Sequence, residues 1–331
     1  MANSPDQTTS LSSKPQEASL KDCRSCCDKI SNLPDDLIYR ILSFLPTKQA
    51  VATSVLSKRW ICLWTLVPTL DLEEPDHCRI DEQAKMKFVH FVYRVLLLNK
   101  AGSVEKFRLN CNPVYGHSCI NTWICSAIER GLQEVDISIS ETAKKDLVKL
   151  PSSLFLVKTL KNLKLHGGIM VDVPGSVCFP SLKILHLLCI YYANVDSVRW
   201  LISGCLSLEE LRIDASISHK NMGNINISTP TLNSLSLTLH HDYRQKVEIN
   251  APSLKYLNFS CPGFGPRQYF VENFPCLIEA NISVENCYII QFWGALNSVK
   301  CLKLHGLHHL LVQVGDTLTM LKFVFIIFCI A

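Results

Sequence analysis

A pattern of apolar and polar positions, apolar-x-x-apolar-x-apolar, recurs ten times along the chain. Successive copies begin 19 to 28 residues apart, close to the period of leucine-rich repeats. Each copy predicts one short strand, whose last two apolar residues point into a core while the residues between and beside them point outward. The copies begin at Val104, Leu132, Leu160, Leu182, Leu208, Leu232, Leu254, Leu277, Val299 and Leu318.

Stacked units of this kind form a parallel sheet on the concave side of a curved solenoid. We therefore expect an α/β fold with leucine-rich repeats over residues 104–322, whose connections cross the convex side as short helices or irregular turns. The preceding residues 73–103 are expected to form a linker and a capping helix, because apolar side chains recur at helical spacing over residues 84–98. The apolar face of this helix consists of Phe88, Phe91, Val92, Val95 and Leu96.

Residues 30–72 have a different pattern, dense in apolar side chains and interrupted by residues that begin or end helices. Pro34 suits a first helical turn, and Pro46 ends that helix. Thr47 and Ser57 are candidate caps of a second and a third helix. Three short helices of this size cannot bury so many apolar side chains, so the surplus docks either on a partner or on the rest of the same chain.

The stretch LPDDLIYRILSFLPTKQAVATSVLSKRWICLW, followed by a Val-Pro-x-Leu-Asp-Leu ending, resembles the F-box of plant F-box proteins. The resemblance implies binding to a Skp-type adaptor and, through it, to the cullin and the RING protein of a ubiquitin ligase. It also implies a set of adaptor-facing residues, some of which fill the core of the module instead. These candidates are Leu33, Pro34, Leu37, Ile41, Leu45, Trp60 and Trp64.

The resemblance continues through the repeats, as in FPSLKILHL and LISGCLSLEELRI, and covers roughly residues 30–310. Leu206 departs from the proline usual in the family, and the sequence ends at Ala331, whereas many relatives carry a further domain after the repeats. The resemblance implies a substrate-recognition subunit of an SCF-type ligase, whose repeats bind an unknown target protein. The alternatives are a non-degradative interaction scaffold and a truncated isoform with impaired target binding.

The outward positions of the predicted strands would form the surface that meets the target. Basic and acidic rungs alternate there around a hydroxyl-rich middle, which suits a protein or peptide partner with its own charge pattern. The alternatives are a solvated surface without a ligand and an inositol phosphate site, which the scattering of the basic residues disfavours. The candidate target-facing residues are Arg108, Lys164, His186, Arg212, Ser236, Tyr256, Asn258 and Lys303.

The two ends of the chain lack these patterns. Residues 1–29 are polar with balanced charge and are expected to be a disordered tail. Their Cys23-x-x-Cys26 pair has no second pair to complete a zinc site. Residues 323–331 form an apolar tail, which we interpret as a truncated or alternatively spliced end; the alternatives are a buried terminal strand and a membrane-surface anchor.

Composition and charge narrow the classes of partner and the locations that the sequence favours. The 331 residues are 48% hydrophobic, and 33 Lys and Arg against 29 Asp and Glu give a net charge of +4. This charge is too small to favour nucleic acid, and no apolar run is long enough to predict a membrane-spanning helix. The 16 cysteines, without an export signal, indicate a reducing intracellular location, in the nucleus or the cytoplasm.

Signatures of catalysis are missing from the sequence. It contains no Gly-x-x-x-x-Gly-Lys-Ser/Thr phosphate loop and no Gly-x-Ser-x-Gly nucleophile elbow. The His240–His241 and His308–His309 pairs lack carboxylates at ligand spacing. We therefore expect no enzymatic activity, no cofactor and no metal in this chain, so other subunits of the ligase would transfer ubiquitin.

Overall fold

A computed structural model describes most of the predicted F-box and repeat regions. The described residues are 33–76, 81–141, 146–175, 177–215, 222–239, 245–261, 269–284, 295–296 and 299–305. Several predictions fall outside these ranges: the disordered tail with Cys23 and Cys26, the repeat at Leu318, the apolar tail 323–331, and the histidine pairs His240–His241 and His308–His309.

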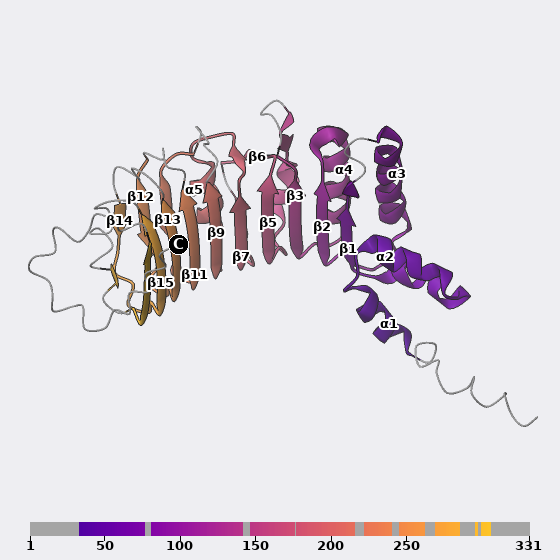
Figure 1. Cartoon of the computed structure of the whole chain (residues 1–331), viewed down its shortest axis with the longest axis horizontal. Helices are drawn as coiled ribbons and strands as arrows, with labels where there is room; N and C mark the ends of the chain where they lie inside the picture. Colours follow the sequence, from indigo (N-terminus) through magenta and orange to yellow (C-terminus); the bar gives the residue numbers. More distant parts are fainter. Residues whose placement is uncertain are drawn as a thin grey trace, which may run out of the picture.

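Ten parallel strands of the described residues form one continuous sheet (Figure 1). Each strand pairs with the strand of the next repeat, so the sheet grows by one rung per repeat and the molecule is elongated (Figure 1). In sheet order, the strands are β1 (Thr69–Glu73), β2 (Lys106–Cys111), β3 (Glu134–Ile139), β5 (Asn162–Gly167), β7 (Ile184–Leu188), β9 (Glu210–Ala215), β11 (Ser234–Leu239), β13 (Tyr256–Cys261), β15 (Glu279–Val284) and β16 (Cys301–His305).

The predicted repeat strands are confirmed for the nine copies of the pattern that the structure describes. In each copy the strand begins two residues after the first apolar position, as β5 does after Leu160. Leu160, Leu163 and Leu165 are all buried, while Asn162 and Lys164 between them are half-buried. Because the strands pair in register, the inward aliphatic side chains of successive repeats stack into one core.

The convex side differs from the prediction of helices and irregular turns, because it also carries strands. Two three-stranded parallel sheets lie there beside helices and 3-10 turns. One sheet contains β4 (Val148–Lys149), β6 (Ile169–Val171) and β8 (Tyr191–Tyr192), and the other β10 (Ile225–Ser228), β12 (Val247–Asn250) and β14 (Tyr269–Val271). The helical elements are η5 (Pro113–Tyr115), α4 (Gly116–Ile128), η7 (Ser152–Leu156) and α5 (Ser197–Ser203).

These convex strands are two to four residues long, too short for the alternation of apolar residues to stand out in the sequence. Only β10 and β12 show a short alternation that could have indicated strands. Ile225 and Ile227 alternate with polar residues in β10, as do Val247 and Ile249 in β12. These segments form strands because they pair with the same segment of the neighbouring repeat, rather than because of their own β-propensity.

The predicted capping helix is confirmed as α3 (Glu82–Leu98). The Asp81 carboxylate caps its first turn by accepting a hydrogen bond from the Gln83 N–H at 2.8 Å. Phe88, on the buried face, meets the ring of Trp123 on α4 edge to face at 6.1 Å between centroids. The helix thus covers the first repeats through aromatic packing.

The N-terminal module comprises α1 (Asp35–Leu42), α2 (Thr47–Ala52) and the 3-10 segments η1 (Thr53–Val55), η2 (Lys58–Ile61) and η3 (Leu63–Leu66). The predicted third helix is thus present as 3-10 segments rather than as an α-helix, and Ser57 stands at the cap position of η2 without a side-chain cap hydrogen bond. The predicted cap of α2 is wrong. Pro46 occupies the cap position, and the Thr47 hydroxyl instead accepts a hydrogen bond from the N–H of Asp71 at 2.8 Å.

The module and the solenoid share one hydrophobic core rather than being joined by a linker. Strand β1 lies at the predicted end of the module yet is the first strand of the main sheet, so the sheet begins before residue 104. The Asn99 amide donates to the Val67 carbonyl at 2.9 Å, and Arg130 donates to Asn99 Oδ1 at 2.7 Å. These bonds fasten the end of α3 to both the module and the first repeat.

Candidate interaction surfaces

The N-terminal module exposes a set of large apolar side chains. Helix α1 is apolar on two sides, because Ile38 and Leu42 are buried in the core while Leu37 and Ile41 remain about half exposed, at 47% and 48%. A helix with a second apolar side carries more such surface than its own fold can cover. The apolar face of the module consists of Leu37, Ile41, Phe44, Val55, Leu56, Ile61 and Leu66.

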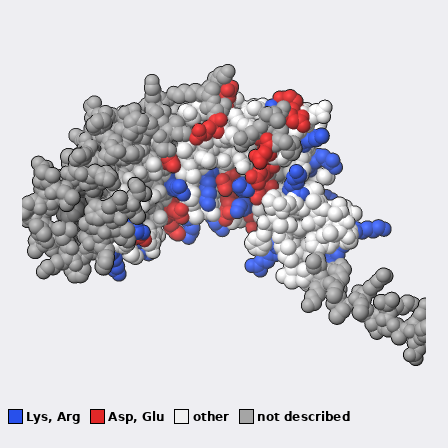
Figure 2. Space-filling view, in the orientation of Figure 1, with Lys and Arg blue, Asp and Glu red and all other residues white. Residues whose placement is uncertain are grey.

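The elements that carry this face are held in contact with one another. Helix α1 packs on η3, and η1 packs on η2. Arg59 of η2 also donates to the Asp35 carboxylate at the start of α1, with Nε 2.9 Å from Oδ1, and to the Leu33 carbonyl. In Figure 2 the module is largely uncharged on the side shown, with Lys and Arg side chains at its margins.

The predicted adaptor-facing residues separate into two groups. Leu37, Ile41 and Pro34 are exposed, and Leu33 and Leu45 are partly buried against the core. By contrast, the side chains of Trp60 and Trp64, which were also predicted to face the adaptor, are only 6% and 8% exposed. The prediction that these two tryptophans face the adaptor is therefore wrong. They fill the core of the module, which was the alternative role that the sequence left open for each candidate.

Five side chains of the apolar face were not predicted from the sequence. Phe44, which is 80% exposed, follows α1, and the others belong to the 3-10 segments η1 to η3 or follow them directly. The available signal was the surplus of apolar residues in a module of this size. The missed residues are Phe44, Val55, Leu56, Ile61 and Leu66.

The concave face carries the outward side chains of the main sheet, and all eight predicted target-facing residues lie on it. Figure 2 shows positive and negative side chains intermixed over the middle of the molecule. Arg108 Nη1 lies 3.1 Å from Asp71 Oδ1, and His186 Nε2 lies 2.7 Å from Glu210 Oε1. Most charges on this face are thus matched across neighbouring strands.

The C-terminal part of the concave face is mostly uncharged and polar. The Asn258 amide donates to the Ser236 hydroxyl at 3.1 Å, and Tyr256 is about half exposed beside them. Lys303 Nζ lies 2.7 Å from Glu279 Oε1, and this hydrogen bond, with the carboxylate charge, raises the pKa of the lysine. Such a surface offers donors and acceptors to a polypeptide backbone.

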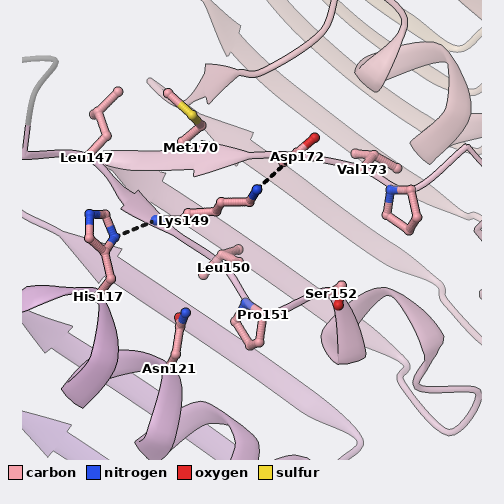
Figure 3. A pocket seen from close by; sticks show the side chains of 11 residues that line it. His117, Asn121, Leu147, Lys149, Leu150, Pro151, Ser152, Met170, Asp172 and Val173 are labelled. Carbon is pink, nitrogen blue, oxygen red and sulfur yellow. Dashed lines mark hydrogen bonds and ion pairs between the residues drawn. The ribbon is translucent and has the colours of Figure 1, made fainter.

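A cavity of about 730 Å³ opens on the convex side between α4 and the sheet of β4 and β6 (Figure 3). The Lys149 N–H donates to His117 Nδ1 at 3.1 Å, and the Lys149 ammonium lies 2.6 Å from Asp172 Oδ2. The remaining lining is largely apolar. It comprises Asn121, Leu147, Leu150, Pro151, Ser152, Met170, Val173 and Pro174.

Within the part of the chain that the structure describes, no three His, Cys, Asp or Glu side chains gather as a metal site would require. The same residues contain no helix long and apolar enough to cross a membrane.

A parallel solenoid with this repeat defines a leucine-rich-repeat protein, and a helical module with an exposed apolar face stands at its N-terminal end. The family model for the F-box domain matches residues 30–71. The model described as "FBD-associated F-box protein At5g56370, LRR repeats" matches residues 120–268. No solved structure matches the chain.

Three similar proteins of Arabidopsis thaliana extend these matches. Identity is 38% to the putative FBD-associated F-box protein At3g50710 and 39% to the F-box/FBD/LRR-repeat protein At4g26340, each over 84% of this chain and 65% of the relative. It is 38% to the FBD-associated F-box protein At5g60610, over 85% of this chain and 70% of the relative. The chain belongs to this family of F-box proteins with leucine-rich repeats, and it spans about two thirds of these relatives' length.

Proposed function

We propose that this chain is the substrate-recognition subunit of an SCF-type cullin–RING ubiquitin ligase. The observation that carries the proposal is the apolar face of the module, seven exposed side chains within the F-box match. Exposed apolar side chains in this density mark a protein interface. The face would dock on a Skp-type adaptor, which connects the chain to the cullin and the RING protein.

The concave face of the repeats would hold the target protein, and the chain itself would perform no bond chemistry. Holding target lysines near the conjugating enzyme raises their effective concentration, which is how an adaptor accelerates transfer. This function places the protein inside the cell, in the nucleus or the cytoplasm. Such a location would keep the cysteines of this chain, among them the buried Cys111 and Cys205, as thiols.

The test is co-expression with a plant Skp-type adaptor, followed by co-purification and an affinity measurement. A Leu37→Ala/Ile41→Ala variant removes two side chains of the apolar face that contribute little to the core. We expect it to bind the adaptor at least about 30-fold more weakly, since interface anchors contribute about 2 kcal/mol or more.

The matched control is Leu97→Ala/Val114→Ala, which shortens two exposed apolar side chains outside the module. This variant should keep the affinity of the natural sequence. A folded natural chain that does not bind the adaptor would overturn the proposal and favour an interaction scaffold. Equal losses in both variants would show that the apolar face is not the docking site.

A further inference from the structure

Two cations on the concave face lack a carboxylate partner in an otherwise matched surface. Lys106 Nζ lies 3.8 Å from Glu134, Arg108 pairs with Asp71, and Lys303 pairs with Glu279. Lys164 and Arg212 make no ion pair with any residue that the structure describes. These are the exceptions among the Lys and Arg side chains on the outward positions of the described strands.

The two unmatched cations lie close together, at the centre of the sheet. Lys164 on β5 is in register with His186 on β7, and His186 is in register with Arg212 on β9. Adjacent strands are about 4.8 Å apart, so the α-carbons of Lys164 and Arg212 are roughly 10 Å apart. Their long side chains reach a common ligand above His186. We call Lys164 and Arg212 the cationic row.

The carboxylates around the cationic row are already engaged. Asp136, the neighbour of Lys164 in the ladder, lies 4.0 Å from the guanidinium of Arg108. Oε1 of Glu210 lies 2.7 Å from Nε2 of His186. Since the carboxylates of Asp136 and Glu210 pair with other side chains, the ammonium of Lys164 and the guanidinium of Arg212 keep hydrogen-bond donors that a ligand could take.

We propose that the cationic row binds an acidic segment of the target protein through its anionic oxygens. A guanidinium takes a carboxylate or a phosphate by two parallel hydrogen bonds, and an ammonium adds a point charge. Ser236 and Asn258, on the strands that follow, offer neutral hydrogen-bonding groups to the rest of the segment. The inference rests on the proposed function, because it takes the concave face to be the target surface.

The probe is a short fluorescein-labelled polyglutamate peptide, titrated with the full chain at low salt and read by fluorescence anisotropy. A phosphoserine peptide of equal length forms a second arm, which distinguishes carboxylates from phosphates as the source of the oxygens. A polyglutamine peptide is the neutral reference. We expect the chain to bind one or both of the anionic peptides and not the neutral one, with an affinity that falls as salt rises.

The decisive comparison is between two double variants with the same loss of charge. Lys164→Gln/Arg212→Gln removes the unmatched cations, whereas Lys106→Gln/Lys303→Gln removes two matched cations from the same face. The first should weaken binding about tenfold or more, and the second should leave it within about threefold. Far-UV circular dichroism of both variants checks that they are folded.

Equal losses in the two variants would overturn the proposal, because they would show attraction by net charge rather than by the cationic row. Absence of binding to both anionic peptides by the natural chain would also overturn it. Neither result bears on adaptor docking, which co-purification measures separately through the N-terminal module.

Discussion

Arg108 on β2 lies directly across from Asp71 on β1, with the guanidinium Nη1 3.1 Å from the carboxylate Oδ1. The pair joins the strand that ends the N-terminal module to the first predicted repeat. Around it, Leu70 and Leu72 of β1 are buried in the core of the solenoid. The module is therefore the first unit of the sheet rather than a separate domain on a tether.

The first prediction concerns this shared core. Leu70→Ala should lower the free energy of unfolding by about 2–5 kcal/mol, because it leaves a cavity between the module and the sheet. Urea unfolding, followed by tryptophan fluorescence and by far-UV circular dichroism, should give coincident transitions with a lower midpoint. Arg108→Gln is the control, since a partly exposed ion pair contributes less than about 1 kcal/mol. Fluorescence and circular dichroism transitions that fail to coincide would mean that the module and the repeats unfold independently.

The second prediction separates core from interface within the module. Trp64→Ala should destabilise the protein by about 3–5 kcal/mol, since this side chain is buried. Phe44→Ala should change the stability by no more than about 0.5 kcal/mol, because the ring is exposed, yet weaken adaptor binding. Thermal unfolding and adaptor titration of both variants check this assignment. A Phe44→Ala variant with natural adaptor affinity would exclude Phe44 from the interface.

The third prediction tests a tight crossing between repeats. Gly167 ends β5 with a φ of +84°, and a Cβ built on it would overlap the carbonyl oxygen of Ile139. Gly167→Ala should therefore cost about 2 kcal/mol or more, from strain in φ and from the displaced backbone. Gly175→Ala, where a Cβ would meet open space, should be nearly neutral. Equal midpoints for the two variants in urea would contradict this explanation.

The fourth prediction concerns alkaline pH. Burial raises the pKa of the Cys205 thiol from 9.0 to about 12, and burial also raises the pKa of Cys111. In the unfolded chain Cys205 loses its proton near pH 9, while in the folded chain it keeps the proton. The unfolded state then binds fewer protons, so stability should fall as pH rises from about 9 towards 12.

A Cys205→Ala variant isolates this contribution, because the other groups that titrate at high pH are unchanged. Its urea midpoint should decline less steeply with pH than that of the natural chain. Thiol labelling gives an independent check: exposed Cys178 and Cys276 should react in the folded protein, whereas Cys111 and Cys205 should react only after unfolding. Identical pH slopes for the two proteins would refute the assignment.

Much of the fold was predictable from the spacing of apolar residues alone. Leu160, Leu163 and Leu165 show why: a period of two within a strand and a recurrence every twenty or so residues both follow from backbone geometry. The capping helix was predictable for the same reason, since the spacing of Phe88, Val92 and Val95 is helical. The convex strands were not, because pairing with neighbouring repeats, rather than their own composition, determines them.

The spacing of apolar residues was enough to predict which residues are buried in the repeats, where the main strands run and which of their side chains face outward. Which partner each remaining side chain finds depends on how the elements pack together in the folded chain. Trp60 and Phe44 are both large and apolar, yet the first fills a core and the second is left in solvent. Lys106 and Lys164 occupy outward positions, yet only the first is matched across a strand. Periodicity sets the direction of a side chain, whereas its partner depends on elements distant in the chain.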